Sequence, residues 1–235
     1  CDRLFLRPCA RHGAHLHGGL RMPPLAAPDA AAVEKGLPNL EKHVESIRAF
    51  GETPVVALNR FGADTDEEVA MVQRRCETLG APFAVSDHYA RGGDGALDLA
   101  RTLVQHADRT ARPFRPLYER RTAVPEKIRA VARAMYGADD VSFTARAERD
   151  LRDVIRLGHD DLPVCIAKVP GSLSDDPSLR GRPRGFRITV REIQVAAGAG
   201  FLVVLTGDIL RMPGLPKEPR AEKIDLLGES ILGVE

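Results

Sequence analysis

The sequence predicts an α/β fold that begins with a Rossmann-like parallel strand–helix–strand unit and continues into a second, mixed α/β domain. Residues 54–58 form a short apolar run with the β-branched content of a buried strand. Residues 64–79 combine acidic side chains in the first turn with apolar side chains at helical spacing, and residues 82–85 form a second apolar run. Because the joints are short, the two strands are expected to be parallel and linked by a right-handed crossover.

Both predicted strands bring their carboxyl ends to the same edge of one sheet, which is where open parallel sheets bind ligands. Phe61 lies just beyond the first strand and Tyr89 just beyond the second. Aromatic residues make up only 5% of the chain, so this pair stands out. Two aromatic faces at one edge predict a slot for a flat heterocycle. The spacing is equally compatible with one or both rings covering the core.

A glycine-rich loop, residues 91–95, joins the second strand to the next helix. Its backbone N–H groups and the helix N-terminus form the kind of surface that holds an anion. Glycine clusters of this kind are more often tight turns, so the sequence leaves both interpretations open.

The rest of the chain divides into three parts. Residues 1–35 show neither helical nor strand periodicity and are expected to be poorly structured. Residues 36–117 contain the Rossmann-like unit, and residues 118–235 form the C-terminal α/β domain, with the boundary at the proline-containing stretch 112–116. Further helices are expected at 37–50, 96–108, 124–136 and 144–157, and further strands at 164–168, 186–193 and 201–205.

Composition excludes several classes of protein. A chain of 235 residues with a net charge of +1 can bury a core but has no field that favours nucleic acid or a membrane surface. No apolar run is long enough to span a bilayer and the start lacks a secretory signal, which favours the cytoplasm. The four cysteines form no close pair and favour free thiols. Since the chain does not begin with Met, we expect that what precedes Cys1 has been lost, cut away or never translated.

Several polar residues have simple structural explanations. Asp139 and Asp140 are expected to be turn and cap residues, and Lys168 to be a solvated strand end rather than an anion ligand. No metal site is expected, because the spacing of the cysteine and histidines near the start matches no zinc pattern; these residues are Cys9, His12, His15 and His17.

Small residues precede the last predicted strand. Ala197, Gly198 and Gly200 let backbone approach either a ligand or a neighbouring strand, and the sequence does not separate the two. No G-x-x-x-x-G-K-[ST] phosphate loop occurs anywhere in the chain, and no serine or cysteine lies in a nucleophile elbow.

Several long motifs, in the same order, resemble the carboxyl-terminal part of the formate–tetrahydrofolate ligase family, from about Gly36 to Lys223. The motifs are GLPNLEKH at 36–43, NRF at 59–61 followed by DTD at 64–66, SD at 86–87 leading to GGDG at 92–95, LPVCIAK at 162–168, SDDP at 174–177, GFRITVRE at 185–192, AGAGF at 197–201, LTGDI at 205–209 and MPGLP at 212–216.

The resemblance implies an enzyme that makes formyl phosphate from formate and ATP with Mg²⁺, then passes the formyl group to N10 of tetrahydrofolate. In the family a Phe and a Trp hold the pterin ring between them, and the matching positions here are Phe61 and Tyr89. Val85 is expected to line the same pocket, with Gly92, Gly93 and Gly95 at its mouth. On the nucleotide side the expected residues are Ala197, Gly198 and Gly200. A homo-oligomer is expected, and a monovalent cation is possible, for the full-length family.

The departures from the family pattern limit this implication. The family's phosphate loop, its lysine and a formyl-phosphate arginine belong to an amino-terminal half that this sequence lacks, so we expect a fragment of a larger ligase with little activity alone. The alternatives are a non-catalytic folate- or pterin-binding module, a subunit that complements a separate amino-terminal half, and a gene remnant. An uncovered strand of the larger sheet would also make the isolated chain marginally stable or self-associating.

Overall fold

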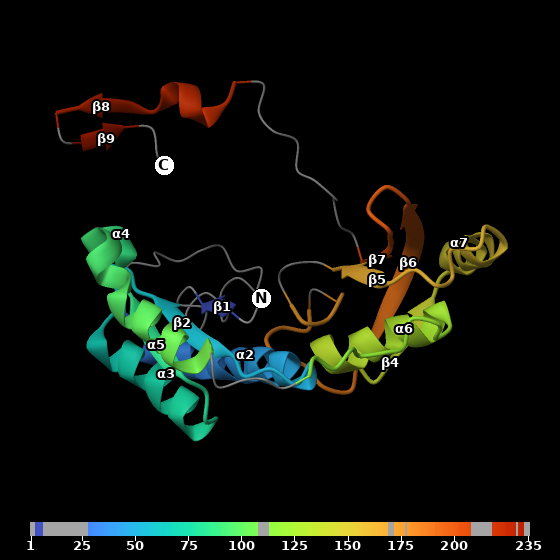
Figure 1. Cartoon of the computed structure of the whole chain (residues 1–235), viewed down its shortest axis with the longest axis horizontal. Coiled ribbons are helices and arrows are strands. Elements are labelled where there is room, and N and C mark those ends of the chain that lie inside the picture. Colours follow the sequence, from blue (N-terminus) through green and yellow to red (C-terminus); the bar gives the residue numbers. More distant parts are fainter. Residues whose placement is uncertain are drawn as a thin grey trace.

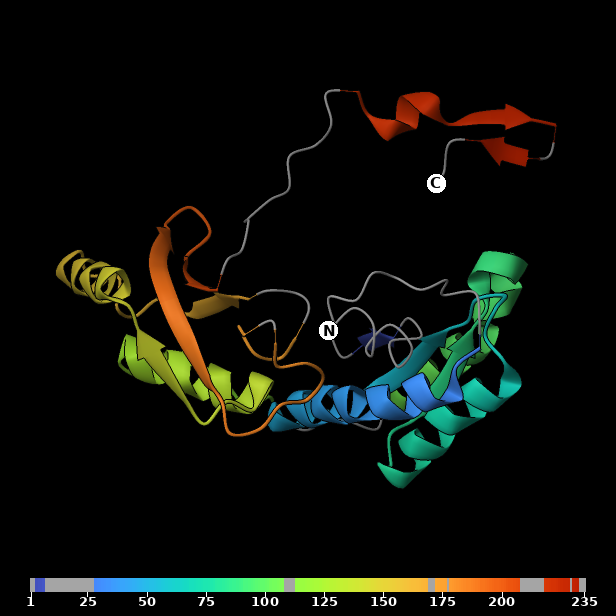
Figure 2. The same ribbon diagram turned by 180° about the vertical axis from the view of Figure 1, so that it is seen from behind.

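The computed structural model describes residues 3–6, 28–107, 113–168, 172–176, 178–207, 218–228 and 230–232. Figure 1 shows two α/β units side by side, with helix α2 running from the first towards the second; Figure 2 gives the view from behind. The first unit comprises β1 (Arg3–Leu6), α2 (Ala30–Ala49), β2 (Val55–Asn59), α3 (Asp66–Thr78), β3 (Phe83–Ser86), α4 (His88–Arg91), the 3₁₀ helix η1 (Gly92–Ala96) and α5 (Leu97–Ala107).

The parallel crossover predicted from the sequence is confirmed. Strands β2 and β3 are parallel neighbours, in a register that pairs Val56 with Phe83 and Asn59 with Ser86. The connecting helix α3 begins after Thr65, whose hydroxyl accepts the Glu68 N–H while the Glu68 carboxylate accepts the Thr65 N–H. This reciprocal cap fixes where the chain turns from strand into helix.

The two faces of this sheet are covered by different helices. Val56 packs with Val72 and Cys76 in a core formed largely by α2 and α3. On the opposite face, Val55 and Ala57 pack with residues of β3 and α5. Because successive side chains of a strand alternate between faces, an unbroken apolar strand such as β2 is suited to burial on both sides.

The start of the chain is more regular than expected. Strand β1 pairs in parallel with β2, so β2 is the central strand of a sheet ordered β1-β2-β3. Helix α2 begins at Ala30, capped by the Asp29 carboxylate. The expectation of poor structure through residue 35 is therefore wrong for these two segments, since it rested on local periodicity and strand pairing is tertiary. Residues 7–27, which include the Cys9–His17 cluster, lie outside the described residues.

The second unit contains a mixed four-stranded sheet ordered β4-β6-β7-β5. Strands β6 and β7 form an antiparallel hairpin, while β4 runs parallel to β6 and β5 parallel to β7. Along β6 the side chains of Ile188 and Val190 are buried and those of Arg187 and Thr189 are exposed, as the alternating sequence predicted. The elements are α6 (Val124–Val131), a π-helical turn η2 (Ala132–Tyr136), β4 (Asp140–Phe143), α7 (Ala145–Arg156), β5 (Val164–Ala167), β6 (Arg187–Ala196) and β7 (Phe201–Thr206).

Strand β4 was not predicted, and the interpretation of Asp140 as a turn or cap residue is wrong. Asp140 is the first residue of this edge strand and pairs in register with Arg187. Its carboxylate lies 3.2 Å from Arg129 Nε and 3.1 Å from Arg187 Nη2. A backbone N–H from Val141 and these arginines hold the pKa of Asp140 below its ordinary value, so it stays charged where a sequence pattern suggests a turn.

The core of the second unit lies between α6, α7 and the sheet, and includes Ile128, Ile188 and Val204. A fully buried lysine, Lys127, lies beside it. Its Nζ donates to the carbonyl oxygens of Asp160 (2.8 Å) and Leu162 (3.0 Å), so the amine is satisfied by the turn that leads into β5. Burial is the main cause that lowers the pKa of Lys127.

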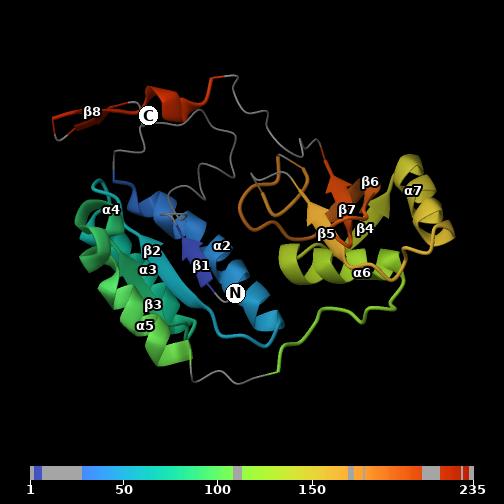
Figure 3. The same ribbon diagram turned by 45° about the horizontal axis from the view of Figure 1, so that its top comes forward.

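The two units meet at the carboxyl-terminal half of α2 (Figure 3). Lys42 and Ser46, both buried, donate through Nζ and Oγ to the carbonyl oxygens of Ala134 and Met135 in the π-helical turn. A π-turn leaves carbonyls without their regular helical partners, and α2 supplies replacements. The proline-containing stretch also packs here: Phe114 stacks on Phe50 with ring centroids 5.4 Å apart.

The carboxyl-terminal segment forms a 3₁₀ helix η3 (Arg220–Lys223) and a two-stranded antiparallel hairpin, β8 (Asp225–Leu227) and β9 (Ser230–Leu232). No helix among the described residues is long and apolar enough to cross a membrane.

The two described cysteines are expected to differ sharply in reactivity. Cys76 is fully buried between α2 and α3, and burial raises the pKa of its thiol to about 11, whereas Cys165 on β5 is exposed. Since the thiolate is the nucleophile, iodoacetamide at pH 8 should alkylate Cys76 about 100-fold more slowly than Cys165. Peptide mapping by mass spectrometry measures both rates, with the urea-unfolded chain as control. Equal rates in the folded chain would show that the α2–α3 core opens readily.

Candidate functional site

The candidate site is the edge of the first sheet at which β2 and β3 end. Asn59 and Ser86 are the last residues of these strands and face each other in register. The Arg60 N–H then donates to the Ser86 carbonyl oxygen at 2.9 Å, which extends the pairing by one bond. Parallel pairing therefore delivers the two following segments, one with Phe61 and one with Tyr89, to the same edge.

The segment after β2 is a tight turn around Phe61. The Phe61 N–H donates to the Asp64 carboxylate at 2.8 Å, and the Asp64 N–H donates back to the Phe61 carbonyl oxygen at 2.9 Å. The Phe61 side chain is half-buried. This turn holds the start of the ring's side chain in a fixed direction, at the point where the chain leaves the sheet.

Tyr89 lies in the short helix α4, directly after β3, and its side chain is 87% exposed. An exposure this large excludes the alternative that Tyr89 covers the core. Large aromatic surfaces left open to water are typical of ligand or partner contacts. Val85, which precedes these residues on β3, is half-buried and pairs in register with Leu58. The use of these side chains to hold a ring stays a prediction.

The glycine-rich segment is helical rather than an open loop, which corrects the expectation for residues 88–95. Helix α4 is followed directly by η1, and Gly92 between them has φ +56°, a conformation that favours glycine. Gly95 is required for a different reason, because a Cβ there would lie 2.2 Å from the carbonyl oxygen of Asp87. The Asp87 N–H donates to the Gly95 carbonyl oxygen at 2.9 Å and closes the segment on itself.

A polar cluster below this segment was missed from the sequence. The Ser86 side chain is 4% exposed, and its Oγ lies 3.0 Å from Nδ1 of the exposed His88. The buried Oδ1 of Asn59 has no hydrogen-bond partner among the described residues. A serine that ends a strand two residues before a histidine was the only signal available, and local pattern gives it no weight.

The small residues Ala197, Gly198 and Gly200 form the exposed turn of the β6–β7 hairpin, in the second unit. The N–H groups of Ala199 and Gly200 donate to the Ala196 carbonyl oxygen, at 3.0 and 2.9 Å, so they are not available to a phosphate in this conformation. Gly200 has φ +73°, which the turn itself explains. A nucleotide-binding role for the three residues stays a prediction, without support from this geometry.

Lys168 is not the solvated strand end that was expected. It is half-buried, its Nζ donates to the Ser174 carbonyl oxygen at 3.3 Å, and it lies 5.7 Å from the centroid of the Tyr136 ring. Burial lowers the pKa of Lys168 to about 8, against the opposing charge of Asp175. The Asp175 carboxylate also accepts the Thr189 N–H at 2.9 Å, which ties the segment after β5 to strand β6.

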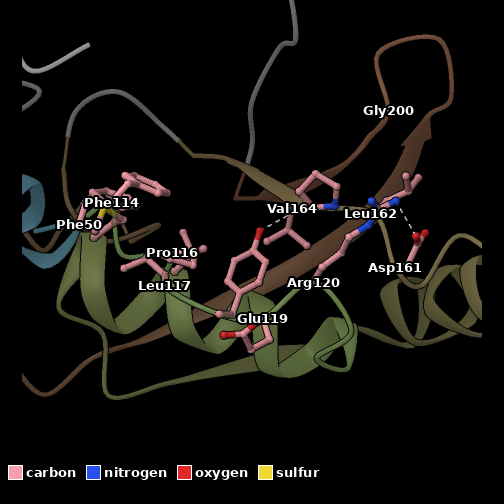
Figure 4. Close-up of a pocket in the computed structure, with 14 residues that line it drawn as sticks. Phe50, Phe114, Pro116, Leu117, Glu119, Arg120, Asp161, Leu162, Val164 and Gly200 are labelled. Atoms are coloured by element: carbon pink, nitrogen blue, oxygen red, sulfur yellow. Dashed lines mark hydrogen bonds and ion pairs between the residues drawn. The ribbon is translucent and has the colours of Figure 1, made fainter. Parts of the chain in front are cut away.

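A cavity of about 810 Å³ lies in the second unit, between the proline-containing stretch, α6 and the start of β5. Figure 4 shows Phe50 and Phe114 at one end and Arg120 with Asp161 at the other. That ion pair, 2.8 Å between Nη2 and Oδ2, is largely exposed. Within the described ranges no three His, Cys, Asp or Glu side chains gather closely enough to hold a metal ion.

The first unit therefore belongs to the class of α/β proteins that offer a ligand-binding edge at the carboxyl ends of parallel strands. A family model described as formate–tetrahydrofolate ligase matches residues 10–235. The chain belongs to this family, and its place is among the ligases of tetrahydrofolate and one-carbon metabolism.

Gly95 provides a sharp test of the candidate site. In Gly95→Ala the added Cβ would lie 2.2 Å from Asp87 O, so the α4–η1 segment must shift, whereas a Cβ at Gly93 meets nothing within 4 Å. Tetrahydrofolate binding, measured by calorimetry, should weaken about tenfold or more in Gly95→Ala, the equivalent of about 1.4 kcal/mol. Gly93→Ala, the matched control, should stay within about twofold of wild type. Equal binding by all three chains would separate this segment from the folate site.

Proposed function

We propose that this chain forms the folate side of an ATP-dependent ligation of formate to tetrahydrofolate, with the pterin ring held between Phe61 and Tyr89. The observation that carries the proposal is the parallel pairing of β2 and β3, which brings both aromatic residues to one edge. Tyr89 presents a largely open face there, and Phe61 rises from a hydrogen-bonded turn. Val85 and the glycines Gly92, Gly93 and Gly95 would complete the pocket.

The reaction proposed has two stages. Formate and ATP, with Mg²⁺, give formyl phosphate, and the formyl group is then transferred to N10 to give 10-formyltetrahydrofolate. Phosphoryl transfer depends on positive charge and positioning around the phosphate, usually from a phosphate loop and its lysine. No such loop occurs in the 235 residues, and the β6–β7 turn has its central N–H groups already bonded. We therefore assign to this chain the binding and orientation of the folate, and no step of phosphoryl transfer.

A second candidate function is folate or pterin binding without catalysis. The lack of a phosphate-loop motif in the sequence favours it over a complete ligase. Between these two lies a complementation subunit, which would act when paired with a chain that carries the nucleotide side. Recovery of formyl transfer on mixing with such a chain separates the last possibility from simple binding. For all three we propose a cytoplasmic location, and for the complete ligase a homo-oligomer.

Substitution of Tyr89 tests the stacking directly. Tyr89→Ala should weaken tetrahydrofolate binding about 3- to 10-fold, the equivalent of about 0.5–1.5 kcal/mol for an aromatic pair. Tyr89→Trp offers a larger face and should bind at least as tightly as wild type. Because Tyr89 is 87% exposed, neither substitution should change the thermal midpoint appreciably, and calorimetric scans provide that control. Unchanged affinity in Tyr89→Ala would contradict the proposed function.

A further inference from the structure

The polar cluster of Asn59, Ser86 and His88 has a defined order along the sheet edge. Asn59 and Ser86 occupy paired positions in parallel strands, so their side chains project from the same face of the sheet. Ser86 Oγ in turn lies 3.0 Å from His88 Nδ1. The cluster thus runs from a buried amide, through a buried hydroxyl, to an exposed imidazole directly beside Tyr89.

The buried amide decides how the hydroxyl proton is used. Asn59 Oδ1 is buried and has no hydrogen-bond partner in the part of the chain that the structure describes. Leaving such an acceptor unsatisfied costs about 1–3 kcal/mol. The rotatable hydroxyl of Ser86, on the paired strand position, is the donor best placed to relieve this cost. With its proton turned towards Asn59, Ser86 Oγ can only accept from His88, which places the imidazole proton on Nδ1.

A proton on Nδ1 leaves the lone pair on Nε2, the nitrogen that does not face Ser86. This arrangement, in which a second group fixes the tautomer of a histidine, is common where the histidine acts as a base. We propose that His88 accepts the proton that N10 of tetrahydrofolate loses during formyl transfer, with Ser86 and Asn59 as positioning residues. The inference rests on the proposed function and deepens it.

The step is balanced without any further reactant. The N10 lone pair attacks the formyl carbon of formyl phosphate, the bond between that carbon and the phosphate oxygen breaks, and phosphate leaves with the bonding electrons. The N10–H proton moves to the lone pair on Nε2 of His88. Because the His88 side chain is exposed, the imidazolium then returns this proton to water or to the departing phosphate.

The first test reads the tautomer and needs no ligand. Long-range ¹H–¹⁵N spectra of the labelled full chain distinguish the two imidazole nitrogens, and His88→Phe assigns the His88 signals. We expect the Nδ1–H form in wild type and its loss in Ser86→Ala. An Nε2–H form in wild type would overturn the inference and leave the proposed function intact. His106, whose Nδ1 lies 2.8 Å from the Thr102 carbonyl oxygen on α5, is the internal control and should not change in Ser86→Ala.

The second test compares two folates by calorimetry. Tetrahydrofolate carries a proton on N10 and 10-formyltetrahydrofolate does not. His88→Phe keeps a ring but removes the acceptor, and should weaken tetrahydrofolate binding about 3- to 10-fold while 10-formyltetrahydrofolate stays within about twofold. His88→Gln, which keeps an acceptor oxygen, should recover most of the loss, and far-UV circular dichroism verifies folding of each variant.

The outcomes separate the inference from the proposed function. An equal loss for both folates, or no loss for either, would show that His88 does not contact N10 and would overturn the inference alone. A wild-type chain that binds neither folate would overturn the proposed function, and the role of His88 with it.

Discussion

The parallel pairing of β2 with β3 is the constraint on which the candidate site depends. A crossover of this hand obliges two strands that are adjacent in sequence to leave the sheet at one edge, whatever residues follow them. The chain then places different groups on the two exits. After β2 comes a turn that is tied by Asp64 and carries Phe61, and after β3 comes a helical segment that is closed through Gly95 and carries Tyr89. Core packing by α2, α3 and α5 keeps the strands in register, so the edge inherits its geometry from the interior.

Elements with strong local signals could be predicted from the sequence, and those that arise from tertiary contacts could not. The crossover unit was correct because apolar length, first-turn acids and a closing glycine are local features. Strand β4 was missed because its first residue, Asp140, is typical of turns, and its place is fixed by pairing with β6 and by two arginines distant in sequence. Strand β1 was missed for the same reason, since only its neighbour β2 makes it a strand.

The candidate site shows the same division. That Phe61 and Tyr89 reach one edge followed from topology, which a sequence can reveal. The openness of Tyr89, the helical form of the glycine segment and the bond between Ser86 and His88 depend on rotamers and on contacts across the sheet edge. Lys168 is a similar case, because its burial against Tyr136 comes from the folding of the segment after β5 rather than from its place at a strand end.

The contact between α2 and the π-helical turn bears on how separable the two units are. The proline-containing stretch marks a boundary in composition, yet Lys42 and Ser46 from one side satisfy backbone oxygens on the other. Severing the chain there would leave a buried ammonium group without its acceptors in one piece and bare carbonyls in the other. Each piece would then carry a polar scar where an apolar surface might have been trimmed without harm, so the natural unit of inheritance for this sequence is the pair.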